Sequence, residues 1–213
     1  MKRRDARTNR AMPRTLRMAW ATALAVALVS QAQPASARRV RPPRVPAGLE
    51  VDAGSKAFLV GHAVGTQNYI CLPSGSAFAW TLFTPQATLF DDKGKQITTH
   101  FLSPNPFENG TLRPAWQHSR DTSSVWVRLS ASSSDPAYVA SGSIAWFLLE
   151  VVGSGSGARG GDALTATTWI QRLNTYGGVA PATGCSVSTD VGKREFVPYS
   201  ADYLFYRFTK DVV

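Results

Sequence analysis

The sequence predicts an all-β protein: an antiparallel β-sandwich or barrel-like single domain, preceded by a signal peptide. From residue 45 onward, about nine short β-rich runs are separated by Gly, Pro, Asn, Asp and Ser. No part of this range has the 3.6-residue apolar spacing of an amphipathic helix. Many short strands joined by turns form antiparallel sandwiches or barrels.

The predicted strands follow one another closely along the chain. In order they cover residues 57–63, 66–71, 77–83, 87–90, 95–102, 124–129, 144–152, 165–175 and 203–208. Val64 and Gly65 lie between the first two runs and are predicted to form a hairpin turn. The fourth and fifth runs are separated by residues 91–94, Asp-Asp-Lys-Gly, which is a tight-turn sequence.

Two segments are harder to assign. Residues 144–152 are apolar throughout, a pattern that a buried strand and a buried helix share. Residues 103–122 contain Pro104, Pro106 and Pro114 and are predicted to be the longest irregular stretch. Long loops in compact domains are often functional, so this stretch is a candidate site.

Residues 1–37 are a predicted signal peptide. Seven basic residues come first, residues 18–29 are apolar, and Ala35-Ser36-Ala37 offers small residues to signal peptidase. The apolar run of about 12 residues is shorter than the roughly 20 that span a bilayer, so no membrane span remains after cleavage. The predicted mature chain has an Arg/Pro-rich lead, 38–47, and one β domain, 48–213. Its localisation is extracytoplasmic, either periplasmic or secreted.

The basic charge belongs to the leader. The formal net charge is +9, but removing residues 1–37 removes seven bases and one acid and leaves +3. A pI of about 10.0 would otherwise point to nucleic acid. No nucleic-acid partner is therefore predicted.

The two cysteines, Cys71 and Cys185, are predicted to form a disulfide bond. The alternatives are a catalytic thiol, which needs a partner histidine, and a metal site, which needs more Cys or His ligands than the chain offers in a recognisable pattern. No metal site and no cofactor are predicted.

The candidate chemistry is sparse. Residues 155–160 match G-x-G-x-x-G, but the β-like segment that follows and the missing acid predict a Gly/Ser loop instead of a dinucleotide site. His62 lies mid-strand and is predicted to be structural. His100 at a strand end, with Trp116 and His118 in the long loop, forms the best polar–aromatic cluster.

Several motifs together resemble a known family. They are GTQNYIC at 65–71, ATLFDDKG at 87–94, PAWQ at 114–117, IQRLNTYGG at 170–178, APATGC at 180–185 and VPYSADY at 197–203. The set resembles a family of secreted bacterial and fungal proteins classed as a domain of unknown function. The resemblance implies an exported, disulfide-capable domain and supplies no catalytic residues. Some fungal members carry a malate dehydrogenase label, which nothing in this sequence supports.

Polar residues within the motifs are further candidates for ligand binding. Gln67, Gln171 and Arg172 lie in strand-like segments, and inward-facing polar groups must be hydrogen-bonded, either in a structural network or to a ligand. Arg172 is the natural anchor for a carboxylate or a sugar hydroxyl.

The sequence favours a non-enzymatic extracytoplasmic binding or surface-interaction domain. Its partner would be a carbohydrate, a small acid or an envelope component. One alternative is a hydrolase of envelope or extracellular polymer, with His100 or His118 as acid/base and Asp91, Asp92 or Asp202 assisting. The other is a structural or stress-related envelope protein.

Overall fold

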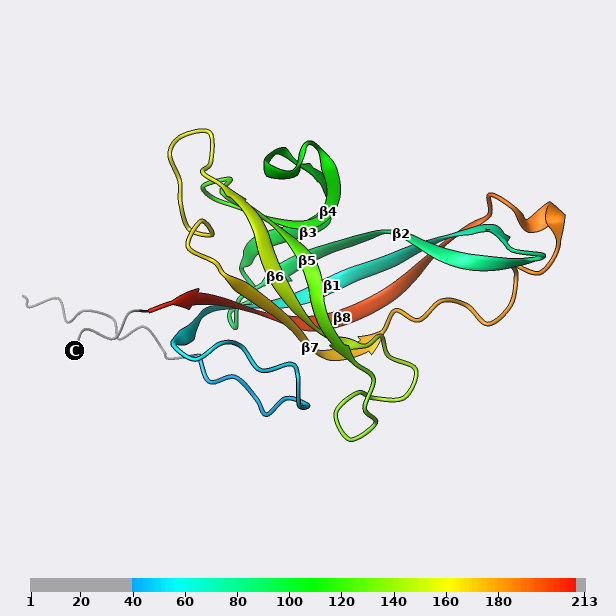
Figure 1. Cartoon of the computed structure of the whole chain (residues 1–213), viewed down its shortest axis with the longest axis horizontal. Coiled ribbons are helices and arrows are strands. Elements are labelled where there is room, and N and C mark those ends of the chain that lie inside the picture. Colours follow the sequence, from blue (N-terminus) through cyan, green and yellow to red (C-terminus); the bar gives the residue numbers. More distant parts are fainter. Residues whose placement is uncertain (1–39, 210–213) are drawn as a thin grey trace, which may run out of the picture. The chain divides into compact units, whose positions relative to one another are not determined.

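A computed structural model describes residues 40–209 as a closed antiparallel barrel of eight strands (Figure 1). The strands are β1 Ser55–Ser74, β2 Ala77–Phe90, β3 Gln96–Asn105, β4 Thr111–His118, β5 Ser124–Ser133, β6 Trp146–Gly155, β7 Trp169–Gly177 and β8 Arg194–Phe208. Each strand pairs with the next, and β1 pairs with β8. The prediction of an all-β domain is confirmed, with the barrel as the form it takes. The predicted signal peptide lies outside the described residues.

The predicted hairpin at Val64 and Gly65 is wrong, because β1 is one continuous strand. A Cβ at position 65 would lie 2.0 Å from the backbone oxygen of Gln86 and 2.5 Å from Cα of Ala87. The glycine therefore permits β1 and β2 to approach closely and does not turn the chain. The long β1–β2 hairpin and the start of β8 extend beyond the other strands (Figure 1).

The segment 103–122 is also more regular than predicted. It holds the end of β3, the 3₁₀ helix η1 Pro106–Glu108 and all of β4. Asn105 caps η1 by accepting a hydrogen bond from the backbone N–H of Phe107 (3.0 Å), and Glu108 pairs with Arg113 (2.8 Å). The prolines of this segment thus belong to a short hairpin and not to a loop.

The ambiguous run 144–152 is resolved as part of β6. Neighbouring residues of β6, such as Leu148 and Leu149, are both buried although they face opposite sides of the sheet, which is why the run 144–152 does not alternate. The interior cluster includes Leu149, Ile170 and Phe205. A second cluster on the outer face, including Leu148 and Leu204, is covered by Leu49 and neighbouring residues of the segment before β1.

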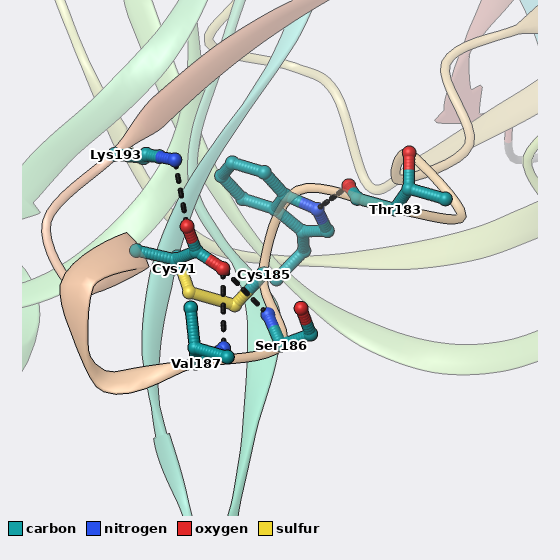
Figure 2. Close-up of a disulfide and its surroundings, with 8 residues drawn as sticks. Cys71, Thr183, Cys185, Ser186, Val187 and Lys193 are labelled. Atoms are coloured by element: carbon teal, nitrogen blue, oxygen red, sulfur yellow. Dashed lines mark hydrogen bonds and ion pairs between the residues drawn. A yellow bond between two sulfur atoms is a disulfide. The ribbon is translucent and has the colours of Figure 1, made fainter.

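The predicted disulfide between Cys71 and Cys185 is confirmed (Figure 2). It ties β1 to the connection between β7 and β8, which contains the 3₁₀ helix η2 Ser188–Asp190. Next to it, Trp80 donates its indole N–H to the carbonyl of Thr183 (2.9 Å), and Asp190 accepts from the backbone N–H of Ser186 (2.9 Å). Within residues 40–209, no helix has the length and hydropathy needed to cross a bilayer.

Candidate ligand site in the barrel

Four of the sequence-predicted residues meet at one end of the barrel interior. Gln67, His100, Trp116 and Arg172 line a cavity of about 120 Å³, to which Phe147 also contributes. The strand register explains the convergence, because His100 is paired with Trp116 across β3 and β4 and Phe147 with Arg172 across β6 and β7. Side chains that face each other on paired strands lie on the same side of the sheet.

The imidazole of His100 is neutral. It is buried against Trp116, with ring centroids 3.9 Å apart and nearly parallel planes. Burial lowers the pKa of His100 to about 3. Nδ1 lies 3.0 Å from the carbonyl oxygen of Ala115 and must donate its hydrogen there. The other ring nitrogen, Nε2, is therefore a hydrogen-bond acceptor.

Arg172 is a buried cation that no carboxylate pairs with among residues 40–209. Its Nε and Nη2 donate to the carbonyl oxygen of Ala145 at 3.2 and 2.8 Å, and its guanidinium lies 3.7 Å from the centroid of Phe147. The side chain is 7% exposed. These contacts fix the guanidinium in place but leave its charge without a counter-ion.

Two tyrosines that the sequence analysis missed complete this end of the interior. The hydroxyls of Tyr199 and Tyr203 lie 3.3 Å apart, and burial raises the pKa of each, so both stay neutral. The positive charge of Arg172 opposes part of the rise in the pKa of Tyr203. The alternation of residues 199, 201, 203 and 205 in the last strand was the signal that places them on one face.

A wider space of about 340 Å³, called the mouth below, shares four lining residues with the cavity. Gln67, Leu82, Phe147 and Arg172 line both spaces, so they mark the junction between them. Residues 143–145 border the mouth. They are held to β7 because the backbone N–H of Ile144 donates to the carbonyl oxygen of Gly177 (3.0 Å). The half-exposed Leu82 gives the opening an apolar rim.

Two side-chain donors of residues that line this cavity are buried without an acceptor. Buried side-chain polar atoms without a partner are few among the described residues, and they include Nε2 of Gln67 and Nε1 of Trp116. Both residues are at most 2% exposed and both line the same cavity. Both nitrogen atoms are enclosed by the surrounding side chains and belong to the packed interior beside the cavity.

The other two candidates lie elsewhere. Gln171 faces outward, where its amide donates to the carbonyl of Leu49 and accepts from the hydroxyl of Tyr206. It therefore belongs to a structural network. His118 ends β4, bonds to Asp121 (2.9 Å) and lines neither space.

The acids named for a hydrolase do not reach His100. Asp92 and Asp202 instead bond the two ring nitrogens of His62 at 2.9 and 2.7 Å on the barrel exterior. Their hydrogen bonds raise the pKa of His62. Among residues 40–209, no Asp or Glu lines the inner cavity, and no group of three or more His, Cys, Asp or Glu residues is arranged to hold a metal ion.

Comparison with known proteins gives one match. Residues 52–207, most of the chain, match the sequence profile of a family described as "Protein of unknown function (DUF3455)". No curated protein and no solved structure matches the chain.

Proposed function

We propose that this chain, which belongs to the DUF3455 family of proteins of unknown function, is an extracytoplasmic protein that binds a small carboxylate in its barrel. The carboxylate would lie at the junction between the inner cavity and the mouth, held by Arg172. Gln67 and Phe147, which line both spaces, would border it.

The observation that carries this proposal is the buried guanidinium of Arg172. Removing a charge from water is costly unless a counter-charge and hydrogen bonds compensate. Of the five N–H groups of an arginine, two are used by Ala145, which leaves three that can donate to an anion. A guanidinium with free N–H groups in a rigid position binds carboxylates through paired hydrogen bonds.

The surroundings favour a single negative charge. Arg172 is the one Lys or Arg residue, among those described, that lines either space. The remaining walls of the inner cavity are aromatic and aliphatic, so a second carboxylate would be buried without a cation. The ligand is therefore a monocarboxylate.

The same residues favour binding over hydrolysis. No Ser, Cys, Asp or Glu among the described residues lines the inner cavity, so it offers neither a nucleophile nor an acidic partner. A pKa of about 3 makes His100 a weak general base at neutral pH.

An extracytoplasmic location is supported by two features. The Cys71–Cys185 disulfide is typical of oxidising compartments. The basic, apolar and small-residue segments of residues 1–37 follow one another in the order that export signals use.

The test is a titration of the exported protein with small monocarboxylates, their primary amides and neutral sugars. At 100 times its dissociation constant a ligand adds about 2.7 kcal/mol to the free energy of unfolding, which a thermal shift detects. We expect a shift with carboxylates and none with the amides. Arg172→Gln should abolish it, Arg172→Lys should weaken it, and Arg194→Gln should leave it intact because Arg194 lies over Phe83, outside the site.

Three results would reject the carboxylate site. They are equal responses to acids and amides, a response to sugars alone, and carboxylate binding that survives Arg172→Gln. A thermal shift with sugars alone would favour a carbohydrate partner instead.

A further inference from the structure

We infer that the ligand is an aliphatic monocarboxylate, with its carboxylate at Arg172 and its hydrocarbon chain against Leu82 and Leu129, at an opening in the barrel wall. The inference rests on the proposed function and adds the body of the ligand to its charge. It follows from the points where strand pairing ends and from the side chains that are exposed around the inner cavity.

The barrel wall is incomplete beside the inner cavity. Pairing between β2 and β3 reaches as far as Ala87, opposite His100, and pairing between β4 and β5 reaches as far as Trp126, opposite Ala115. Past these points β3 and β4 continue as a hairpin, and Phe107 at its tip packs on Trp126 with ring centroids 6.0 Å apart. Within residues 40–209, the remaining parts of β2 and β5 pair on one side only, with β1 and β6. At this end, strand pairing therefore does not close the wall between β2 and β5.

Two leucines on the edges of this opening are exposed although they border the inner cavity. Leu129 is paired with Leu149 of the interior cluster, so its side chain lies on the inner face of the sheet. Leu82, on β2, lines both the inner cavity and the mouth. Leu129 is 53% exposed and Leu82 is 48% exposed. Exposed apolar side chains that converge on one hollow are typical of ligand sites, because a ligand covers them.

The accessible side chains of the inner cavity are mainly aliphatic. Besides the two leucines, Pro114 is partly exposed and lines the same space. Trp116 and Tyr203 are at most 1% exposed, so they offer no ring face to a ligand. The guanidinium of Arg172 covers one face of Phe147, 3.7 Å from the ring centroid. The site therefore favours a flexible hydrocarbon chain over a ring that needs a stacking partner.

The volume of the inner cavity sets the length of the chain. A dry protein cavity of about 150 Å³ takes up benzene, so a cavity of about 120 Å³ holds about five carbon atoms. Each methylene group that is removed from water strengthens binding by about fourfold at most. A longer chain leaves the cavity past the exposed leucines and gains less. Affinity should therefore rise with chain length as far as hexanoate and then level off.

The experiment compares dissociation constants, measured by NMR titration of the exported protein, for acetate, butyrate, hexanoate, octanoate and benzoate. We expect hexanoate to bind about tenfold or more tightly than acetate, because its additional methylene groups leave water. Octanoate should bind within about threefold of hexanoate, since its last carbons stay in contact with water. Benzoate should bind more weakly than hexanoate.

A double variant assigns the hydrocarbon chain to the opening. Leu82→Ser combined with Leu129→Ser should reduce the ratio of acetate to hexanoate dissociation constants severalfold and leave acetate binding unchanged. Leu112→Ser is the matched control, because Leu112 is 59% exposed and lines neither space. In the unaltered protein, the terminal methyl group of hexanoate should show nuclear Overhauser effects to the methyl groups of Leu82 and Leu129, a readout that does not depend on how the variants fold.

The outcomes separate this inference from the proposed function. If carboxylates bind through Arg172 but acetate or benzoate binds as tightly as hexanoate, the aliphatic chain is overturned and the carboxylate site stands. An acetate-to-hexanoate ratio that the double variant leaves unchanged, or hexanoate methyl contacts to other residues alone, also overturns the placement of the chain. If no carboxylate binds at all, both proposals fail.

Discussion

At the scale of single residues, two histidines of the barrel wall respond to pH in opposite directions. Hydrogen bonds that His62 donates to the carboxylates of Asp92 and Asp202 raise its pKa, while burial lowers the pKa of His100 to about 3. The stabilisation from His62 is complete below its unfolded pKa of about 6.5 and is lost as the pH rises through its raised value. His100 acts oppositely, because it has to stay neutral: its contribution falls as the pH drops from about 6.5 toward 3.

We predict that the two imidazoles differ in protonation at about pH 5, between the two pKa values. The ¹⁵N spectrum should show His100 as the neutral Nδ1–H form, since its Nδ1 donates to the carbonyl of Ala115. His62 should be doubly protonated, since each of its nitrogens faces a carboxylate oxygen. A His100 that titrates near its ordinary pKa would mean that water enters the inner cavity freely.

At the scale of secondary-structure elements, the glycine-rich connection between β6 and β7 is a packed structure. A Cβ at Gly157 would lie 1.6 Å from the backbone oxygen of Asp121, and one at Gly161 would lie 2.2 Å from its Cβ. The carboxylate of Asp121 accepts hydrogen bonds from the backbone N–H groups of Ala163 (2.8 Å) and Ser123 (3.0 Å). The glycines thus permit contact with the β4–β5 turn, and no nucleotide is needed to explain them.

Asp121→Asn should lower the free energy of unfolding by about 1–3 kcal/mol, because an amide replaces a charged acceptor of several hydrogen bonds. Burial alone would raise the pKa of Asp121, but its hydrogen bonds outweigh burial and lower that pKa. The stabilisation is therefore present above the ordinary pKa of 3.8 and is lost as the pH falls below it. Urea denaturation at neutral and acidic pH measures both effects. Asp162→Asn, at an exposed position in the same connection, is the control, and equal losses from both variants would contradict this role.

The elements also show where sequence patterns are reliable. The turn at Asp91 could be predicted from its local sequence, Asp-Asp-Lys-Gly. In the structure, the Asp91 carboxylate accepts hydrogen bonds from the backbone N–H groups of Lys93 and Lys95, both at 2.9 Å. The role of Gly65 was missed, because only the approach of β2 reveals why a side chain cannot fit there. Local hydrogen bonds can be predicted from neighbouring residues, whereas close contacts between strands depend on the tertiary structure.

At the scale of the whole domain, the same distinction applies to the candidate site. Gln67, His100, Trp116 and Arg172 were selected as polar or aromatic groups in unusual places, and barrel closure brings them together. Phe147 and the two tyrosines resembled ordinary core residues and were not selected. The strand register distinguishes the residues of the site from those of the core. Phe147 on β6 is paired with Arg172 on β7, and Arg172 is paired with Tyr203 on β8.

Export and the disulfide make one joint prediction for the whole protein. The Cys71–Cys185 bond spans a sequence separation of 114 residues, and closing a loop of that length restricts the unfolded chain by about 4–5 kcal/mol of free energy. Protein collected outside the cytoplasm should have the intact mass of a chain that begins at residue 38. It should take up no thiol reagent until it is reduced.

Replacement of both cysteines by serine should lower the free energy of unfolding by a similar amount, measured in urea without reductant. The serine pair should match the reduced wild-type protein, which separates the loss of the cross-link from the loss of the sulfur atoms. Retention of residues 1–37 after export would contradict the cleavage. Reactive thiols in the untreated protein would contradict the cross-link between β1 and the β7–β8 connection. Equal free energies of unfolding before and after reduction would show that this cross-link does not stabilise the fold. The end of the barrel that carries Arg172 would then be stabilised by strand pairing alone.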